Sequence, residues 1–116
     1  MSTVSHYAET QPTRSEIDQL TGLVALEFGV DWCGHCQAAL PLIAAALAAH
    51  PQIRHIKVED GKGRRLGRSF GVKLWPTLIL LRNGVEITRL VRPVDMGLIT
   101  EALVIPPLIT AVKSRG

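Results

Sequence analysis

The 116-residue chain contains two cysteines, Cys33 and Cys36, separated by Gly34 and His35. Two thiols at this spacing on one helical turn can close a disulfide with little movement of the backbone. A helix start near Cys33 would favour negative charge on its sulfur, and the thiolate is the reactive form of cysteine. A disulfide across so short a loop would restrain the unfolded chain only slightly, so we interpret the pair as reactive rather than structural. The chemistry indicated is thiol–disulfide exchange.

The elements that position the cysteines are an apolar run before them and an Ala-rich run after them. Residues 23–30 are apolar and β-forming, which is typical of a buried strand. Residues 33–49 predict a helix that ends before Pro51 and is kinked at Pro41. We therefore expect the cysteines where a buried strand passes into a helix.

Helix and strand signals alternate through the rest of the chain, as they do in α/β domains. Thr13 and Glu16 form a capping-box pattern that predicts a helix to about residue 20. Residues 77–91 predict a β-hairpin with Asn83-Gly84 as its turn. Three further elements are predicted: a strand over residues 53–59, a helix over 62–70 and a helix over 95–104.

This series of motifs resembles the thioredoxin family. Glu27 lies six residues before Cys33, where thioredoxins carry a buried Asp and protein disulfide isomerase domains a Glu. Pro41 lies eight residues after Cys33, where the family helix is kinked. Residues 70–77 resemble the family segment in which a cis-proline, here Pro76, faces the disulfide. The resemblance runs from about residue 23 to residue 103.

The resemblance implies a thioredoxin-like α/β fold, with a mixed central β-sheet flanked by helices. We expect one domain over residues 1–116, with a polar N-terminal segment (1–12) and a C-terminal tail (105–116). No segment reaches the roughly 20 apolar residues of a membrane-spanning helix, and residues 1–20 lack the hydrophobic centre of a secretory signal. We therefore expect a cytoplasmic protein that does not bind membranes.

The resemblance also implies roles for the catalytic residues. Cys33, exposed at the helix start, is expected to be the nucleophile, and Cys36, more buried, is expected to resolve the mixed disulfide. Glu27 would take or give the proton of Cys36, and the cost of burying a carboxylate favours such a function over a purely structural one. Pro76 is expected to be cis and to align an extended substrate strand.

Four residues are expected to support these: Trp32, Gly34, His35 and Lys57. Trp32 should pack beside the disulfide. Lys57 either lies near Glu27 and compensates its charge or is exposed. His35 replaces the thioredoxin proline and produces the Cys-Gly-His-Cys sequence of disulfide isomerase domains, where a protonated imidazole would stabilise the thiolate.

Three residues are expected on the substrate side: Trp75, Thr77 and Arg92. Trp75 replaces a smaller aliphatic residue and Arg92 a glycine, so the surface offered to a substrate protein should be bulkier and more basic than that of a general thioredoxin. The alternative is that Trp75 folds inward to cover the gap left by Gly29 and that Arg92 points into solvent.

The net charge of +3 arises in the second half of the chain, where residues 59–116 carry ten basic and five acidic side chains. No aromatic residues alternate with the basic ones, so we interpret them as a solvated helix face and expect no nucleic-acid partner.

A zinc site is the sharpest alternative for the cysteines. Cys33, Cys36, His50 and His55 have zinc-finger-like spacing. Pro51 should end the helix directly after His50 and leave His55 on the next strand, and the helix between the pairs would be more than about 20 Å long. We therefore expect no metal.

The expected function is that of a protein-disulfide oxidoreductase that cycles between a dithiol and a Cys33–Cys36 disulfide without another cofactor. Expected partners are proteins with disulfides or thiols and a thioredoxin reductase-type electron donor, and the chain is expected to be a monomer. The alternative is a thioredoxin-like accessory or chaperone module that docks one substrate protein, with exchange secondary. Retention of both cysteines and Glu27 favours the enzyme.

Overall fold

The computed structural model describes residues 12–30, 33–61, 65–93 and 95–104. Within these residues, four strands form one sheet in the order β2-β1-β3-β4. The strands are β1 (Leu23–Gly29), β2 (Arg54–Glu59), β3 (Thr77–Arg82) and β4 (Val85–Val91). β1 is parallel to β2 and antiparallel to β3, and β3 is antiparallel to β4. The sheet is therefore mixed, as predicted.

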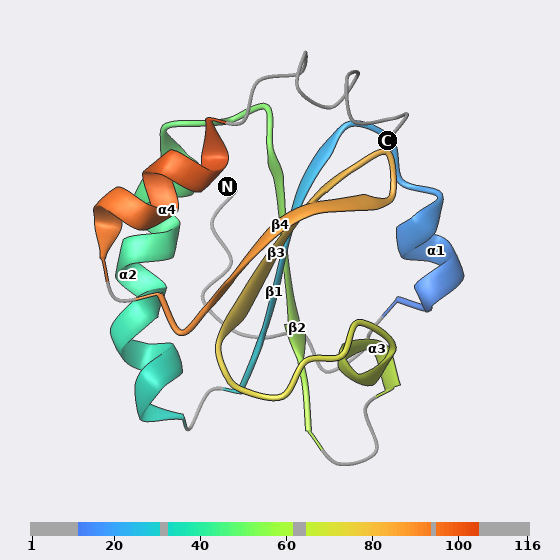
Figure 1. Cartoon of the computed structure of the whole chain (residues 1–116), viewed down its shortest axis with the longest axis horizontal. Coiled ribbons are helices and arrows are strands. Elements are labelled where there is room, and N and C mark those ends of the chain that lie inside the picture. The colour runs from blue at the N-terminus through green and yellow to red at the C-terminus, as the bar shows by residue number, and fades with distance from the viewer. Residues whose placement is uncertain (1–11, 31–32, 62–64, 94, 105–116) are drawn as a thin grey trace.

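The helices of the described residues cover both faces of this sheet. They are α1 (Arg14–Asp18), α2 (Gly34–Ala48), α3 (Arg65–Ser69) and α4 (Met96–Leu103). Figure 1 shows α2 and α4 on one side of the sheet and α1 and α3 on the other. This arrangement confirms the predicted thioredoxin-like α/β fold.

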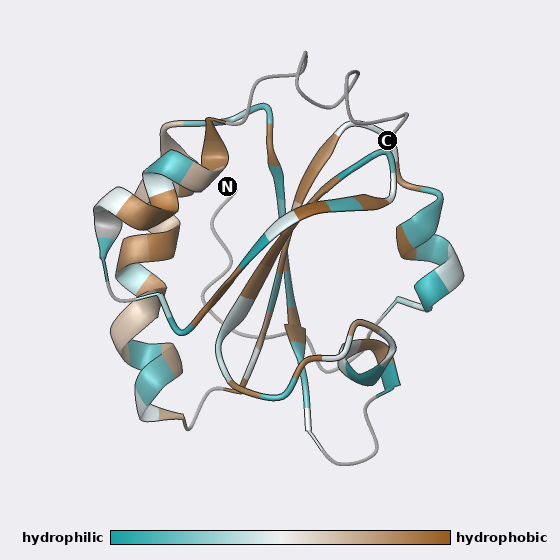
Figure 2. Cartoon of the chain, in the orientation of Figure 1, coloured by the Kyte–Doolittle hydropathy of each residue, from teal (hydrophilic) through white to brown (hydrophobic). Residues whose placement is uncertain are grey.

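Each face of the sheet has its own apolar core, because successive side chains of a strand point to opposite faces. On the α2 face, Ala25 and Leu80 of the sheet pack with Ile43 of α2 and Ile99 of α4. The opposite face packs against α1 and α3 through Val24, Leu26, Phe28, Ile79, Leu81, Ile17 and Leu66. Figure 2 shows hydrophobic stretches along α2 and α4 and in the middle of the sheet. Glu27, two residues after Ala25, therefore lies on the α2 face.

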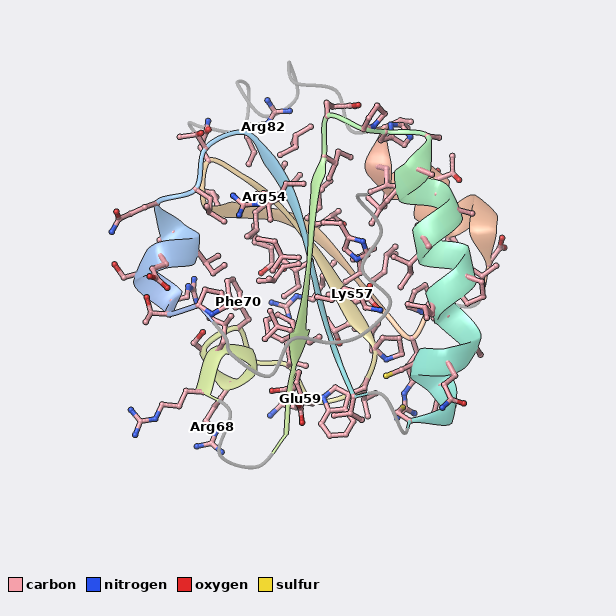
Figure 3. All side chains as sticks on the ribbon, turned by 180° about the vertical axis from the view of Figure 1, so that it is seen from behind. Arg54, Lys57, Glu59, Arg68, Phe70 and Arg82 are labelled. Carbon is pink, nitrogen blue, oxygen red and sulfur yellow. The ribbon has the colours of Figure 1, made fainter. Side chains whose placement is uncertain are left out.

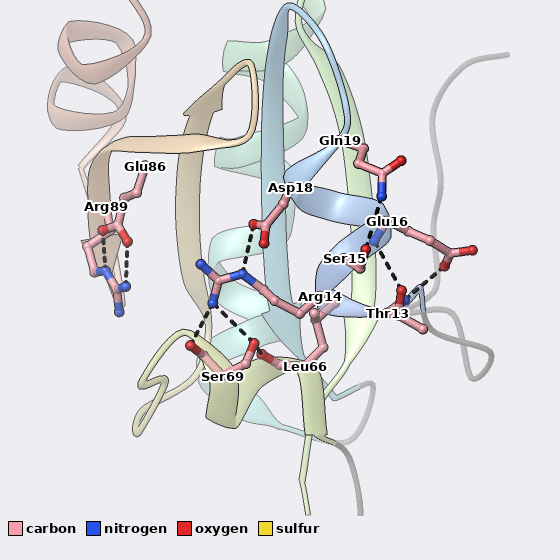
Figure 4. A network of polar contacts seen from close by, with 10 residues as sticks. All are labelled: Thr13, Arg14, Ser15, Glu16, Asp18, Gln19, Leu66, Ser69, Glu86 and Arg89. Atoms are coloured by element: carbon pink, nitrogen blue, oxygen red, sulfur yellow. Dashed lines mark hydrogen bonds and ion pairs between the residues drawn. The ribbon is translucent and has the colours of Figure 1, made fainter. Parts of the chain in front are cut away.

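The capping box at the start of α1 is confirmed. The Glu16 amide donates to Thr13 Oγ1 at 3.0 Å, and the Thr13 amide donates to Glu16 Oε1 at 2.9 Å (Figure 4). The helix ends at Asp18, slightly before the predicted residue 20. Arg14 binds Asp18 and donates to the Ser69 carbonyl at 2.7 Å, which joins α1 to the end of α3.

The hairpin matches its prediction, with β3 and β4 joined by Asn83 and Gly84 at φ angles of 50° and 82°. Both angles are positive, as the tight type I′ turn requires. The other elements differ from their predictions at their ends. β2 begins at Arg54 rather than at residue 53, the described part of the third helix covers Arg65–Ser69, and α4 covers Met96–Leu103 with Asp95 as its N-cap.

Among the described helices, none combines the length and the hydropathy needed to span a bilayer. The N-terminal segment apart from Pro12, the whole C-terminal tail and Trp32 lie outside the described residues.

Candidate active site

The first cysteine caps the helix that carries the second one. Cys33 is the N-cap of α2 with extended backbone angles, and its Sγ accepts a hydrogen bond from the Cys36 amide at 3.4 Å. Both residues are free thiols. The Cys33 sulfur therefore meets the unsatisfied amide groups and the positive end of the dipole of a 15-residue helix.

The predicted exposure of Cys33 is wrong for this structure. Cys33 is 8% exposed and Cys36 is 2% exposed, so Cys36 is more buried, as predicted, but both are interior. The two cysteines form a small cluster with Val30, and Trp75 packs against it. This packing reduces the contact of the Cys33 side chain with water.

The electrostatic surroundings of Cys33 favour its thiolate. Burial acts to raise the pKa of the thiol, and this is the largest single influence. Hydrogen bonds from the backbone and side chain of Cys36 and from the backbone of His35 act in the opposite direction. The positive charge of Arg92 adds to them, and together they hold the pKa of Cys33 below the ordinary value of a cysteine.

Beneath α2, the carboxylate of Glu27 is fully buried and paired. Its Oε1 lies 2.8 Å from Nε2 of His55 on β2, and the side chains of Glu27 and His55 are 0% and 13% exposed. Lys57 is 2% exposed and stands in register with Glu27 across the β1–β2 pair. The alternative of an exposed Lys57 is therefore wrong. Figure 3 shows Lys57 on the side of β2 toward α2.

The pairing of His55 with Glu27 was not anticipated, since the sequence pattern indicated His55 only as the last member of a zinc-like spacing. The signal that could have found it is the alternation of a strand. His55 lies two residues before Lys57 and so points to the same face. Once β1 and β2 are neighbours, that face contains Glu27.

The loop before β3 contains the cis-proline position. The Trp75–Pro76 peptide bond is cis. The hydroxyl of Thr77 donates to the Leu74 carbonyl at 2.6 Å, and Thr77 is only 1% exposed. Its side chain thus holds the loop from inside, which corrects the prediction that it faces a substrate.

Trp75 combines a buried contact with an anchored indole. It is half-buried against the cysteine cluster, and its Nε1 donates to Asp60 Oδ2 at 2.8 Å. Asp60, which the sequence reasoning missed, is 8% exposed. Trp75 therefore neither turns wholly inward nor stands free, and part of its surface borders the site.

Arg92 is held against the loop rather than pointing freely into solvent, so that alternative is wrong. Its Nε donates to the Trp75 carbonyl at 2.8 Å, and its own amide donates to the Pro76 carbonyl at 2.8 Å. Its φ angle is 50°, a left-handed conformation that glycine adopts easily, and thioredoxins carry a glycine at this position. Arg92 also lines a pocket of about 130 Å³ with His35, Ala38, Ala39, Leu42 and Pro93.

Gly34 and His35 form the exposed start of α2. Among the described side chains, no group of three or more His, Cys, Asp and Glu residues is arranged to hold a metal ion. His55 is instead hydrogen-bonded to Glu27.

Two neighbouring thiols at a helix start, one with a lowered pKa and both beside a cis-proline loop, define a dithiol–disulfide exchange site. The family model for thioredoxin matches residues 4–103. A thioredoxin of Chlamydia muridarum is 37% identical over 69 residues, which cover 60% of this chain and 68% of that protein. Human protein disulfide-isomerase A2 is 44% identical over 63 residues, which cover 51% of this chain but 12% of that protein.

A solved structure supports the same relationship. Reduced thioredoxin 2 of Pseudomonas aeruginosa is 52% identical, with a TM-score of 0.79, and the match covers 87% of this chain and 94% of that one. The chain belongs to the thioredoxin family. Like the members of this family, it is a thiol–disulfide oxidoreductase.

Proposed function

We propose that this oxidoreductase acts on protein disulfides through a Cys33/Cys36 dithiol cycle. The observation that carries the proposal is the position of Cys33 Sγ at the N-terminus of α2, where it accepts the Cys36 amide and has a lowered pKa. The thiolate is the species that attacks a disulfide, and a lowered pKa increases its fraction.

The first step uses Cys33 alone. Its thiolate attacks one sulfur of the substrate disulfide, the Cys33–substrate bond forms, and the substrate's own S–S bond breaks. The second substrate sulfur leaves as a thiolate and takes a proton from solvent. Trp75 and Arg92, which border this sulfur, are proposed to contact the substrate strand.

The second step resolves the mixed disulfide. Cys36 gives its proton to the Glu27 carboxylate and attacks Cys33 Sγ, so that the Cys33–Cys36 bond forms and the substrate leaves as a second thiolate. Two electrons have then passed from the cysteine pair to the substrate. The burial of Cys36 and Glu27, at 2% and 0% exposed, supports this role, because a buried carboxylate accepts a proton readily from a buried donor.

Members of this family work with a reductase partner. We propose that a thioredoxin reductase-type donor returns two electrons to the Cys33–Cys36 disulfide, and that the chain acts as a monomer in the cytoplasm. No cofactor beyond the cysteine pair is needed for this cycle.

The test is a pair of cysteine variants incubated with disulfide-containing proteins. Cys36→Ser should accumulate covalent complexes because the attacking thiol survives and the resolving thiol is lost, whereas Cys33→Ser should trap none. Non-reducing electrophoresis measures both. Equal trapping by the two variants would refute the assignment of roles.

Reduction of insulin by the wild-type chain then separates the enzyme from the alternative, a docking module with secondary exchange. An enzyme should turn over repeatedly when a reductant is supplied. A docking module should bind its substrate protein and show little turnover.

A further inference from the structure

The imidazole of His55 connects the buried acid of the site to a pocket. Its Nε2 lies 2.8 Å from Glu27 Oε1, and its side chain is 13% exposed, whereas that of Glu27 is 0% exposed. His55 also lines a pocket of about 530 Å³ between the end of α2 and the start of β2. A proton on Glu27 therefore has a hydrogen-bonded neighbour that reaches a solvent-accessible space.

The pocket is large enough to hold several water molecules, each of which occupies about 30 Å³ in the liquid. Its walls come from the last turns of α2 and from the segment that leads into β2. They are Ala44, Leu47, Ala48, Pro51, Gln52, Ile53, Arg54 and His55. Of these side chains, only His55 is bonded to the buried carboxylate in the described contacts.

The other elements packed on this face supply few titratable groups. The described buried contacts from the body of α2, from β3 and from α4 are apolar, as Ile43, Leu80 and Ile99 illustrate. Among the described residues, the titratable and charged groups on this side of the sheet and at the pocket are Cys36 on the first turn of α2, Lys57 and Glu59 on the same face of β2 as His55, and Arg54 at the pocket.

We propose that His55 is a positioning residue for the exchange reaction. It acts through Glu27 and carries the proton between that carboxylate and the solvent in the pocket. The inference rests on the proposed role of Glu27 as the base for Cys36. During resolution, Glu27 receives the Cys36 proton. With its hydrogen on Nδ1 and a lone pair on Nε2, neutral His55 accepts this proton at Nε2; the Nδ1 proton leaves for water or buffer in the pocket, and Glu27 is again a carboxylate that accepts a hydrogen bond from Nε2–H. No electrons move in this relay, since the sulfurs exchange them directly.

The experiment measures the single-turnover rate of resolution, from the mixed disulfide of Cys33 with a small thiol, in wild type and in His55→Gln. Glutamine keeps an amide that can donate to Glu27 but cannot relay a proton. We expect resolution to slow by about tenfold, less than the roughly hundredfold or greater contribution of a direct general base, because water can replace a relay in part. His50→Gln is the matched control, since His50 is a second histidine outside the residues that line the pocket.

Two readouts distinguish a relay from a structural contact. The His55→Gln rate should rise with buffer concentration, and added imidazole should restore most of the rate of His55→Ala, because the pocket admits it. Thermal unfolding monitors folding, and if His55→Ala does not fold, the buffer dependence of His55→Gln decides.

The possible outcomes distinguish a failure of the His55 relay from a failure of the proposed role of Glu27, on which the relay rests. If Glu27→Gln slows resolution but His55→Gln does not, or slows it with no buffer dependence, the relay is refuted and the role of Glu27 stands. If Glu27→Gln resolves at the wild-type rate, both fail. If the relay operates, the double variant should be no slower than Glu27→Gln, because both residues act in one step.

Discussion

Arg92 shows how one side chain can serve both the backbone and the reactive sulfur. Its φ of 50° costs roughly 1–2 kcal/mol relative to an ordinary conformation. Its guanidinium recovers part of this cost through the hydrogen bond to the Trp75 carbonyl, since such bonds contribute about 0.5–1.5 kcal/mol. Its charge also favours the Cys33 thiolate. Arg92 at this position therefore changes the free energy of unfolding little.

We predict that Arg92→Gly changes the free energy of unfolding by less than about 1 kcal/mol, because relief of the backbone and loss of the hydrogen bond nearly cancel. The pKa of Cys33 should rise slightly, since Arg92 is the smallest of the influences that lower it. The pH dependence of Cys33 alkylation measures this change. Arg92→Lys, which keeps the charge, is the control and should leave that pH profile close to wild type.

At the scale of elements, α3 and the loop after β2 are fitted to each other through Gly67. A Cβ at Gly67 would overlap the carboxylate of Asp60. That carboxylate accepts the hydrogen bond from the Trp75 indole. The position of Trp75 beside the cysteines thus depends on a glycine in a short helix.

Gly67→Ala should therefore destabilise the fold by about 1–3 kcal/mol, the usual cost of overpacking, and displace Asp60. Thermal unfolding measures the stability, and Trp75 fluorescence reports the changed surroundings of the indole. Gly34→Ala is the matched control, because a Cβ there meets no atom within 4 Å, and a helical alanine should be neutral or stabilising. Equal stability losses in the two variants would show that the contact with Asp60 does not matter.

Strand β4 carries an ion pair whose stabilising effect depends on pH. Arg89 donates two hydrogen bonds of 2.7 Å to the Glu86 carboxylate and lowers its pKa. A carboxyl whose pKa is lower in the folded state stabilises the fold above its unfolded pKa. This contribution disappears as the pH falls through the folded pKa.

Glu86→Gln should cost less than about 1 kcal/mol at pH 7, because both side chains are about one-third exposed and solvent screens the pair. The difference from wild type should shrink as the pH falls below the ordinary glutamate pKa of about 4.3, and it should disappear once the pH has passed the lowered pKa of the folded state, where the carboxyl is protonated in both states. Denaturant unfolding at several pH values tests this. Glu101→Gln on α4 is the surface control, and a pH-independent effect of Glu86→Gln would contradict the assignment.

At the scale of the whole molecule, the proposed active site joins four segments of the chain. The start of α2 supplies the cysteines, β1 and β2 supply the buried Glu27–His55 pair, and the loop before β3 supplies Trp75 and Pro76. Since Trp75 borders Cys33 and keeps part of its surface accessible, a protein substrate would meet it and a small disulfide need not.

Trp75→Ala is therefore expected to weaken capture of a protein substrate by about tenfold, the effect of losing roughly 1.4 kcal/mol of contact, while reaction with a small disulfide changes little. Competition between the two substrate types measures both. Leu98→Ala, which removes an exposed apolar side chain from α4, is the control and should change neither rate. A similar loss toward both substrates would show that Trp75 supports the active-site structure.

Local sequence determined the elements and the place of the reactive pair. The capping box at Thr13, the Asn83-Gly84 turn and the helix after Cys33 were all predicted, because caps, turns and helix periodicity depend on residues a few positions apart. The alternation of helix and strand signals indicated an α/β domain, and the resemblance to the thioredoxin family implied its thioredoxin-like fold.

Tertiary structure determined the contacts and the burial of the site residues. The Glu27–His55 pair joins residues 28 positions apart, and the bond from Trp75 to Asp60 spans 15 positions. The burial of Cys33 and the anchoring of Arg92 likewise depend on the loop around Trp75. No periodicity encodes such contacts, because they exist only once the strands have paired and the loops have packed. The sequence by itself therefore determined which thiols react, and the fold determined what surrounds them.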